Sequence, residues 1–110
     1  MTELWHLAEG AEWARALRTG SYERSTRGQS LAEVGFMHCS YPDQLAGVAA
    51  AFYADADDLV LLRIDPARVR AGIRVEDGFP HIYGPIPVTA VTAAEPLTRD
   101  PTGRLLLPDA

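Results

Sequence analysis

Hydrophobic and polar residues alternate along the first part of the chain with the period of a strand and then change to the period of a helix. Residues 3–8 alternate one by one, which places His6 on one face of a predicted strand and Trp5 on the other. Residues 9–19 carry apolar positions at helical spacing, and Gly20 follows them as a typical helix-ending residue. The pattern therefore predicts a strand that runs directly into a helix.

A second strand and helix are predicted after a long polar segment. Residues 21–35 are rich in Ser, Thr, Arg and Gly, which predicts a long loop with a short strand around Tyr22. Residues 36–39 predict a strand that runs into Ser40, a favourable helix N-cap. The apolar stripe that follows predicts a helix that ends shortly after a buried Phe52.

The second half of the chain is dominated by predicted strands. Residues 59–64 form a near-continuous apolar run, typical of a central buried strand, and Asp65 ends it with a single helical turn through Val69. Since strands outnumber helices and the two helices come early, we predict one α+β domain over residues 1–110. Further strands are expected near 73–76, 81–83 and 88–93, with an edge strand or a covering segment in the tail at about 97–110.

Composition and charge exclude several classes of function. The 110 residues carry a net charge of −5, and all ten basic residues are arginine, which argues against broad binding to nucleic acid or anionic lipid. Cys39 is the single cysteine, so no intramolecular disulfide is possible, and no apolar run approaches the roughly 20 residues of a membrane helix. We expect a soluble cytoplasmic protein in which arginine, histidine or backbone N–H groups hold any phosphate.

The three histidines are the main candidates for chemistry. Alternation places His38 on one strand face with Ser40, and His81 on one strand face with Tyr83. The helix predicted to start at Ser40 would present free N–H groups to an anion, beside imidazoles that titrate near neutral pH. If His6 and His81 converge there, the sequence predicts a phosphate-binding site. The alternative is that each histidine is a separate, hydrogen-bonded strand residue.

Four blocks of residues carry a resemblance to a known family. In their order and spacing they are similar to a small bacterial family called domain of unknown function 952, and the resemblance extends to about Ala93. The blocks are Trp5-His6-Leu7, Gly35-Phe36-Met37-His38-Cys39-Ser40, the segment 58–66, and Phe79-Pro80-His81-Ile82-Tyr83-Gly84-Pro85-Ile86. The second and fourth blocks are long and unusual, so the resemblance is specific.

The resemblance implies an ADP-ribosyltransferase-like fold, in which two small, split β-sheets form a cleft that holds NAD in the active relatives. In such a fold His6, on the first strand, would hold the ribose or adenylate part of a nucleotide. His38 and Ser40 would lie on the strand that leads to the second helix, and His81 and Tyr83 on a later strand that faces the same cleft. The implied ligand is NAD or an ADP-ribose-like molecule, and the family itself has no established reaction.

Charged residues of the polar segment complete the candidate site. Arg24 and Arg27 can reach over a phosphate, although solvated loop arginines are the simpler interpretation. Active relatives place a glutamate to stabilise an oxocarbenium-like state, and no acidic residue here stands in a glutamate-x-glutamate signature. Glu33 is closest in sequence to the second block, so it joins His38 and His81 as a catalytic candidate; a surface carboxylate is the alternative. The other acids weighed are Glu76, Asp77 and Glu95.

Two other chemistries stay open. His6, His38 and His81 are enough imidazoles for a catalytic zinc site, but their spacing lacks the close pair that metal motifs usually contain. Cys39 is a candidate nucleophile near the predicted helix start, or else a small buried core residue.

A non-catalytic interaction module is the last alternative, and it belongs to a different class of function. Its apolar surface would be formed by Trp5, Tyr22, Phe79 and the turn at 85–87. The only local basic cluster that would favour RNA is interpreted as solvated, and no nucleic-acid partner is expected; it consists of Arg63, Arg68, Arg70 and Arg74.

Overall fold

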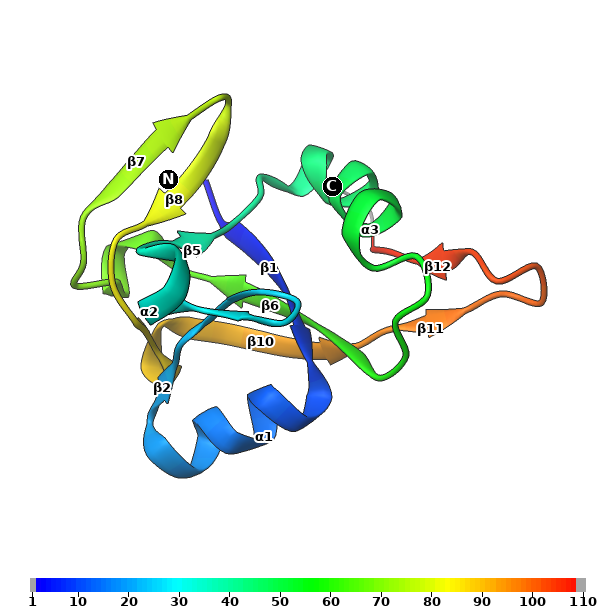
Figure 1. Cartoon of the computed structure of the whole chain (residues 1–110), viewed down its shortest axis with the longest axis horizontal. Helices are drawn as coiled ribbons and strands as arrows, with labels where there is room; N and C mark the ends of the chain where they lie inside the picture. Colours follow the sequence, from blue (N-terminus) through cyan, green and yellow to red (C-terminus); the bar gives the residue numbers. More distant parts are fainter. Residues whose placement is uncertain (1, 109–110) are drawn as a thin grey trace.

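The computed structural model describes residues 2–108. The centre of the molecule is a three-stranded antiparallel sheet (Figure 1). Its strand order is β1-β6-β10, with β1 at Leu4–Glu9, β6 at Leu59–Ile64 and β10 at Val91–Pro96. The predicted central buried strand is confirmed as β6, which pairs with a neighbour along both edges. Both faces of β6 are covered by other elements, which is why all of its residues except Arg63 are apolar.

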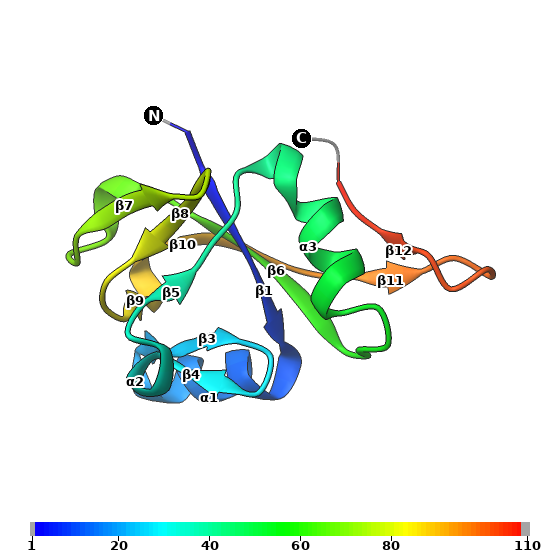
Figure 2. The ribbon, with the colours of Figure 1, turned by 45° about the horizontal axis from the view of Figure 1, so that its top comes forward.

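The two faces of this sheet pack against different parts of the chain. Val60, Leu62 and Ile64 belong to one hydrophobic cluster, which also contains Met37 and Ile82 from a second sheet. Leu59 and Leu61 belong to the other cluster, which also contains residues of β1 and three residues of α3, an eight-residue helix at Leu45–Phe52. Figure 2 shows α3 on one side of the central strands and α1 on the other. The protein therefore has two hydrophobic cores, one on each face of the central sheet.

The second sheet carries two of the histidines. Its order is β5-β8-β7, all antiparallel, with β5 at Met37–His38, β8 at Phe79–Ile82 and β7 at Ile73–Glu76. A two-residue turn joins β7 to β8, and its Asp77 and Gly78 have φ values of 53° and 82°. Such positive φ values at both positions are those of the hairpin turn that matches the twist of the strands.

The first helix is confirmed and the start of the second was predicted wrongly. Helix α1 spans Gly10–Thr19 and ends at Gly20, whose φ is 89°. Ser40 is not a helix N-cap, because its backbone pairs with Trp5 in an isolated β-bridge. A short 3₁₀ turn, η1 at Pro42–Gln44, precedes α3 instead, and the Gln44 side chain accepts from the Tyr41 N–H.

Two side chains predicted in the wrong environment show how tertiary packing overrides local pattern. Phe52 is 58% exposed, because the buried side of α3 is formed by other residues and the helix ends at this position. Trp5 and Tyr22 are each 2% exposed, so they are core residues and not members of a surface patch. Predictions that placed Phe52 in the core and Trp5 and Tyr22 on an interaction surface were therefore wrong.

The long loop predicted over 21–35 is largely structured. It contains β2, β3, β4 and the short helix α2 at Leu31–Val34, with a capping box between Ser30 and Glu33. β2 pairs with β9, while β3 and β4 form a small hairpin. The bounds of the strands are Ser21–Tyr22 for β2, Arg24–Thr26 for β3, Gln29–Ser30 for β4 and Ile86–Pro87 for β9.

The remaining segments follow the predicted pattern with shifted boundaries. The helical turn after β6 is confirmed as η2 at Pro66–Arg68, and the strand expected at 88–93 is divided into the turn η3 at Val88–Ala90 and β10. The tail forms a separate hairpin of β11, at Thr98–Arg99, and β12, at Leu105–Leu106; residues 109–110 of the predicted tail lie outside the described residues.

At the level of fold class, the predicted combination of small split sheets with few helices is confirmed. Within the described range, 2–108, no helix has the length and apolar character to cross a membrane.

Candidate functional site

His38 and His81 lie side by side on the outer face of the second sheet. They are directly paired in the antiparallel register of β5 and β8, and their ring centroids are 5.6 Å apart. The neighbouring positions Met37 and Ile82 are fully buried, so the alternation that buries them turns both imidazoles outward. Phe36 stacks on His81 with its ring centroid 4.1 Å away and an interplanar angle of 9°. The two histidines thus form part of an aromatic shelf.

Glu76 connects His81 to Tyr83. Its carboxylate lies 3.2 Å from His81 Nδ1 and accepts a hydrogen bond from the Tyr83 hydroxyl at 2.5 Å. The Tyr83 hydroxyl, first of all, and His81 lower the pKa of Glu76, while the Glu76 carboxylate raises the pKa of Tyr83. Glu76 is the carboxylate of this site, and the sequence interpretation preferred Glu33. The Asp77-Gly78 turn was the available signal, because a two-residue hairpin places Glu76 across from the strand that bears His81.

His6 is buried behind His38, and its proton position follows from its hydrogen bond to the backbone of that residue. Its Nδ1 lies 2.6 Å from the backbone carbonyl oxygen of His38, which can only accept, so Nδ1 carries the hydrogen. The other ring nitrogen, Nε2, is then an unprotonated acceptor, and it has no partner within the described structure. Burial lowers the pKa of His6 to about 4, so the imidazole is neutral at pH 7.

A small cavity adjoins His6. It offers only about 10 Å³ to the centre of a water molecule, which is room for a single water. Eight residues from β1, β3, α3 and the segment around β5 form its walls: His6, Leu7, Ser25, Thr26, His38, Ser40, Val48 and Tyr53. His81 is not among them, so His38 lies between His6 and the rest of the aromatic shelf, whose His81 is itself only 8% exposed. The expectation of one open cleft lined by all three histidines does not describe this arrangement.

Ser25 fixes the position of the strand that carries His38. Its hydroxyl donates to the Phe36 carbonyl and accepts from the His38 N–H at 3.3 Å. Ser40, on the other side of the cavity, is 2% exposed and gives its N–H to the Trp5 carbonyl at 2.8 Å. The Ser40 N–H, expected to help bind an anion, is therefore already engaged.

The charged residues predicted from the polar segment are held by other partners. Arg24 lies 3.4 Å from Glu12 on α1, and Arg27 forms an ion pair with Asp55, just beyond α3. Glu33 accepts from the Ser30 N–H as part of the cap of α2, and its hydrogen bonds to Ser30 lower its pKa. The Glu33 side chain is therefore engaged in capping the start of α2.

The two other chemistries considered from sequence are not favoured by the geometry. Cys39 is fully buried, and burial raises the pKa of its thiol to about 12, which leaves almost no thiolate at neutral pH. Among residues 2–108 there is no group of three His, Cys, Asp or Glu side chains placed to hold a metal ion. His6 also directs Nδ1 to a backbone carbonyl and is separated from His81.

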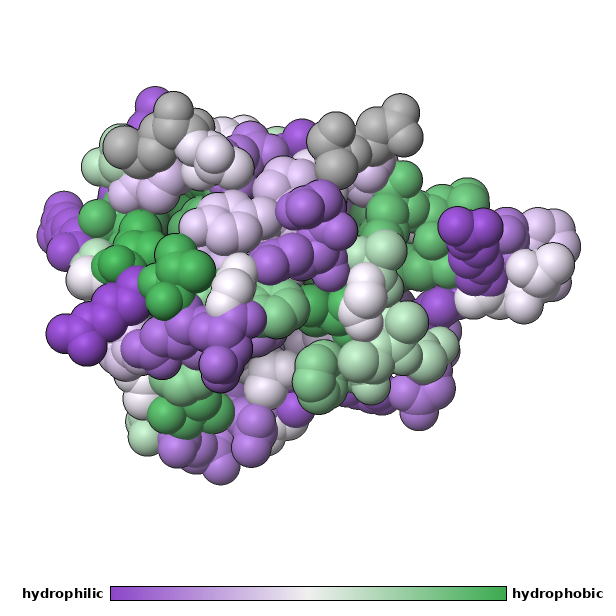
Figure 3. All heavy atoms as spheres, turned by 90° about the horizontal axis from the view of Figure 1, so that it is seen from above, coloured by the Kyte–Doolittle hydropathy of each residue, from purple (hydrophilic) through white to green (hydrophobic). Residues whose placement is uncertain are grey.

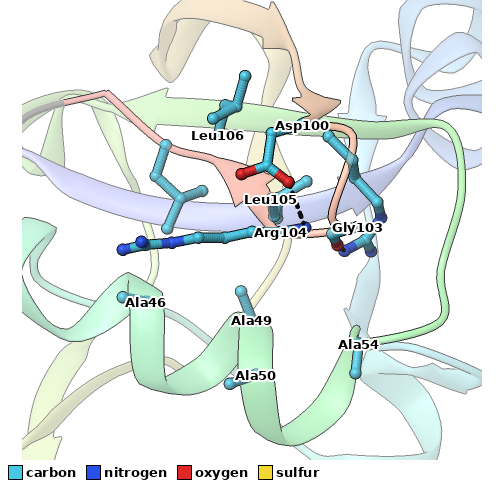
Figure 4. A pocket seen from close by; sticks show the side chains of 11 residues that line it. Ala46, Ala49, Ala50, Ala54, Asp100, Gly103, Arg104, Leu105 and Leu106 are labelled. Carbon is cyan, nitrogen blue, oxygen red and sulfur yellow. Dashed lines mark hydrogen bonds between the residues drawn. The ribbon is translucent and has the colours of Figure 1, made fainter.

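A larger hollow of the described surface lies elsewhere, between α3 and the C-terminal hairpin, and we call it the α3 groove (Figure 4). It offers about 580 Å³, and its lining consists mainly of alanine and leucine: Ala46, Ala49, Ala50 and Ala54 face Leu105, Leu106 and Leu107, with Arg99, Asp100, Gly103 and Arg104 at the hairpin. Figure 3 shows hydrophobic side chains gathered at this end of the molecule. Arg99 donates to the carbonyls of Tyr53 and Ala56, which ties the hairpin to the end of α3.

Comparison with known proteins identifies a family whose description names no activity. A family model described as "Protein of unknown function (DUF952)" matches residues 7–94. The chain is 29% identical to protein CC0527 from Caulobacter crescentus, whose crystal structure aligns over 96% of this chain and 95% of that chain with a TM-score of 0.83. The solution NMR structure of the same protein aligns at 30% identity over 94% and 90% of the two chains, with a TM-score of 0.73. No curated protein matches.

Proposed function

This chain belongs to the DUF952 family of proteins of unknown function, and we propose that its histidine site binds a small phosphorylated, NAD-like ligand. The observation that carries the proposal is the unpartnered Nε2 of His6, a buried acceptor beside a water-sized cavity. A buried polar atom without a partner costs roughly 1–3 kcal/mol, and a ligand hydroxyl that donates to it removes that cost. A ribose hydroxyl is such a donor.

The ligand needs more room than the cavity offers, so its walls must separate. One wall is the β3–β4 hairpin and the other is α3, and the exposed Arg27–Asp55 ion pair joins the two. Exposed ion pairs contribute little to stability, so an incoming phosphate can take Arg27 from Asp55 at small cost. Arg24, three residues earlier on β3, is the second candidate for the phosphate.

The aromatic shelf supplies a place for a planar ring. Phe36 and Phe79 flank the two imidazoles, with the Phe79 ring centroid 5.4 Å from that of His38. Burial, and then His81, lowers the pKa of His38, so an uncharged imidazole faces the ligand at neutral pH. A nicotinamide or adenine ring stacks favourably on such a surface. This arrangement, with His6 on the first strand and two separate sheets around it, supports an ADP-ribosyltransferase-like fold as part of the proposal.

A transferase reaction would place its carboxylate at Glu76. Cleavage of the nicotinamide–ribose bond develops positive charge on the ribose, which a nearby carboxylate stabilises. Glu76 lies with His81 and Tyr83 on the shelf, whereas Glu33 caps α2. If the protein is an NAD-using transferase, Glu76→Gln abolishes nicotinamide release from NAD and Glu33→Gln leaves it intact.

Titration of ¹⁵N-labelled protein with NAD, ADP-ribose and inorganic phosphate tests the binding. We expect concentration-dependent shifts of the backbone amides at His6, Ser25 and His38 with NAD or ADP-ribose. His6→Asn is the informative variant, because the short amide can still donate to the His38 carbonyl while the Nε2 acceptor is lost. It should weaken binding at least tenfold, as expected for the loss of one buried hydrogen bond of about 1.4 kcal/mol.

Ala50→Leu, in the α3 groove, is the matched control and should bind as the wild-type protein does. Absence of shifts with all three compounds would contradict the proposal. Shifts confined to α3 and the C-terminal hairpin would move the ligand to the α3 groove and favour a different function.

A further inference from the structure

Among residues 2–108 no strand pairs with the outer edge of β7, and the register shows which backbone groups this edge presents. The carbonyl of Pro80 accepts from the Cys39 N–H, so Pro80 directs its backbone toward β5. Val75 is opposite Pro80 in the β7–β8 ladder, and this pair is therefore one of the non-hydrogen-bonded pairs. The N–H and C=O of Val75, and by alternation those of Ile73, point away from the sheet. Figure 1 shows β7 as the outermost strand on this side.

The side chains of β7 alternate between two faces of this edge. Val75 is 57% exposed and Ile73 is 36% exposed, so both present aliphatic side chains to solvent. Figure 3 shows hydrophobic side chains gathered at the end of the molecule where β7 lies. Arg74 and Glu76 point to the face of the histidines: the Arg74 guanidinium lies 5.6 Å from the Tyr83 ring centroid, and Glu76 contacts His81. Within residues 2–108 Arg74 forms no ion pair.

We propose that a second copy of this chain pairs with β7 along this edge, antiparallel and with a two-fold axis at Val75. In that register Val75 of one copy is opposite Val75 of the other, and the two residues exchange both main-chain hydrogen bonds. Arg74 of each copy is then opposite Glu76 of the other, in a non-hydrogen-bonded pair whose side chains approach closely. The segment Ile-Arg-Val-Glu is self-complementary in charge only in this register.

The symmetry of this register explains why the partner is a second copy of the same chain. A two-fold interface uses the same patch twice, so each residue must find its complement in its own strand, and opposite charges directly across a ladder are stabilising. An unpaired edge with exposed aliphatic residues is the usual template for such strand addition. Pairing also brings Arg74 of the second copy to Glu76, beside His81, so the second copy contributes a cation to the histidine site.

Sedimentation and light scattering on the full chain test the dimer, and a charge-reversal pair tests its register. We expect the wild-type protein to be a dimer at micromolar to millimolar concentrations. Arg74→Glu alone makes the edge acidic at both positions, and Glu76→Arg alone makes it basic at both. Each should raise the dimer Kd roughly tenfold or more through two like-charge contacts. An equimolar mixture of the two variants should form a heterodimer at the wild-type Kd.

Two further measurements separate the interface from the fold. Val75→Pro removes an outward N–H that β8 does not use, so it should keep the wild-type circular dichroism spectrum and abolish the dimer. The Val75 amide should exchange slowly with deuterium at high protein concentration and rapidly on dilution. Arg15→Glu, an exposed charge reversal on α1, should leave the Kd unchanged. A wild-type chain that stays monomeric to about 1 mM, or a dimer that survives Val75→Pro, would overturn the proposal.

Discussion

The α3 groove is large and mainly apolar, whereas the site around the histidines is small and contains polar groups. The groove offers about 580 Å³ between alanine and leucine side chains, and the Arg99 guanidinium beside it is already hydrogen-bonded to main-chain carbonyls. The cavity at His6 has room for one water, but it adjoins a buried imidazole nitrogen that no described group satisfies. One region has space without an unmet interaction, and the other has an unmet interaction without space.

This difference indicates which region of the folded chain keeps an unsatisfied polar group. Apolar walls facing water in an open groove are ordinary for a protein surface and define no particular ligand. A buried acceptor without a donor is rare, because it raises the free energy of the folded state unless a water or ligand supplies the donor. Chemical recognition is therefore expected at His6, and the groove at most contributes contact area. The comparison makes predictions about both regions.

The largest expected effect is on the reaction rate of the Cys39 thiol, which directly follows β5. This rate tests whether the reactive groups of the histidine region lie on only one face of the strand. The thiol is fully buried and its pKa is raised from 9.0 to about 12 by burial. That shift alone lowers the thiolate fraction at pH 7–8 by roughly 1,000-fold. We expect Cys39 to react with a disulfide reagent at least that much more slowly in native buffer than in urea. Rapid labelling of the folded chain would show that Cys39 belongs to the site.

The second prediction is a loss of stability in acid that belongs to His6. Its folded-state pKa, about 4, is below the unfolded value of 6.5, so the unfolded chain binds more protons between these limits. The stability from burying a neutral imidazole is complete above pH 6.5 and is lost as the pH falls toward 4. The loss between pH 7.5 and pH 4.5 is roughly 2.5 kcal/mol.

Urea unfolding of the wild-type protein and of His6→Asn at the two pH values measures this loss. Other titrating groups are common to both proteins and cancel in the difference between their pH dependences. The variant is expected to lose about 2.5 kcal/mol less than the wild-type protein. Equal pH dependence in the two proteins would mean that His6 is accessible and charged in the folded state, and the contrast between the regions would fail.

The faces that form the aromatic shelf were predictable from sequence because they depend on alternation along each strand. Period-two spacing places His38 with Phe36, and His81 with Phe79, and the β5–β8 register then brings the two faces together. The depth of His6 was not predictable, since it depends on a hydrogen bond to the His38 carbonyl, 32 residues away, and on the packing of α3.

The incorrect predictions arose where two local signals compete. Ser40 has the residue type of an N-cap, but its backbone pairs with Trp5, and the following Tyr41 is capped by Gln44. Glu33 is near the histidines in sequence, but the capping box with Ser30 binds its carboxylate. At Ser40 a tertiary contact, the bridge to Trp5, decides the competition, whereas at Glu33 a local capping box engages the side chain.

The third prediction concerns the polar network of the shelf, which has no counterpart in the α3 groove. The Tyr83 hydroxyl is the largest influence that lowers the pKa of Glu76. Tyr83→Phe removes that hydrogen bond, so the pKa of Glu76 should rise toward its ordinary value while the contact with His81 persists. Carbon NMR of the side-chain carboxyls follows this titration. Glu33 is the internal control, because Ser30 lowers its pKa independently of Tyr83; an unmoved Glu76 would separate Tyr83 from the network.

The smallest effect is expected in the α3 groove. Ala50 is exposed on its wall, so Ala50→Leu adds apolar atoms to open space and should change the free energy of unfolding by no more than about 0.5 kcal/mol. Ser25→Ala is the contrasting change: it removes one atom near His6 but leaves the Phe36 carbonyl and His38 N–H unpaired, a cost of roughly 1–3 kcal/mol. If urea unfolding gave the opposite order, the groove would be the better-optimised region, and a ligand should be sought there first.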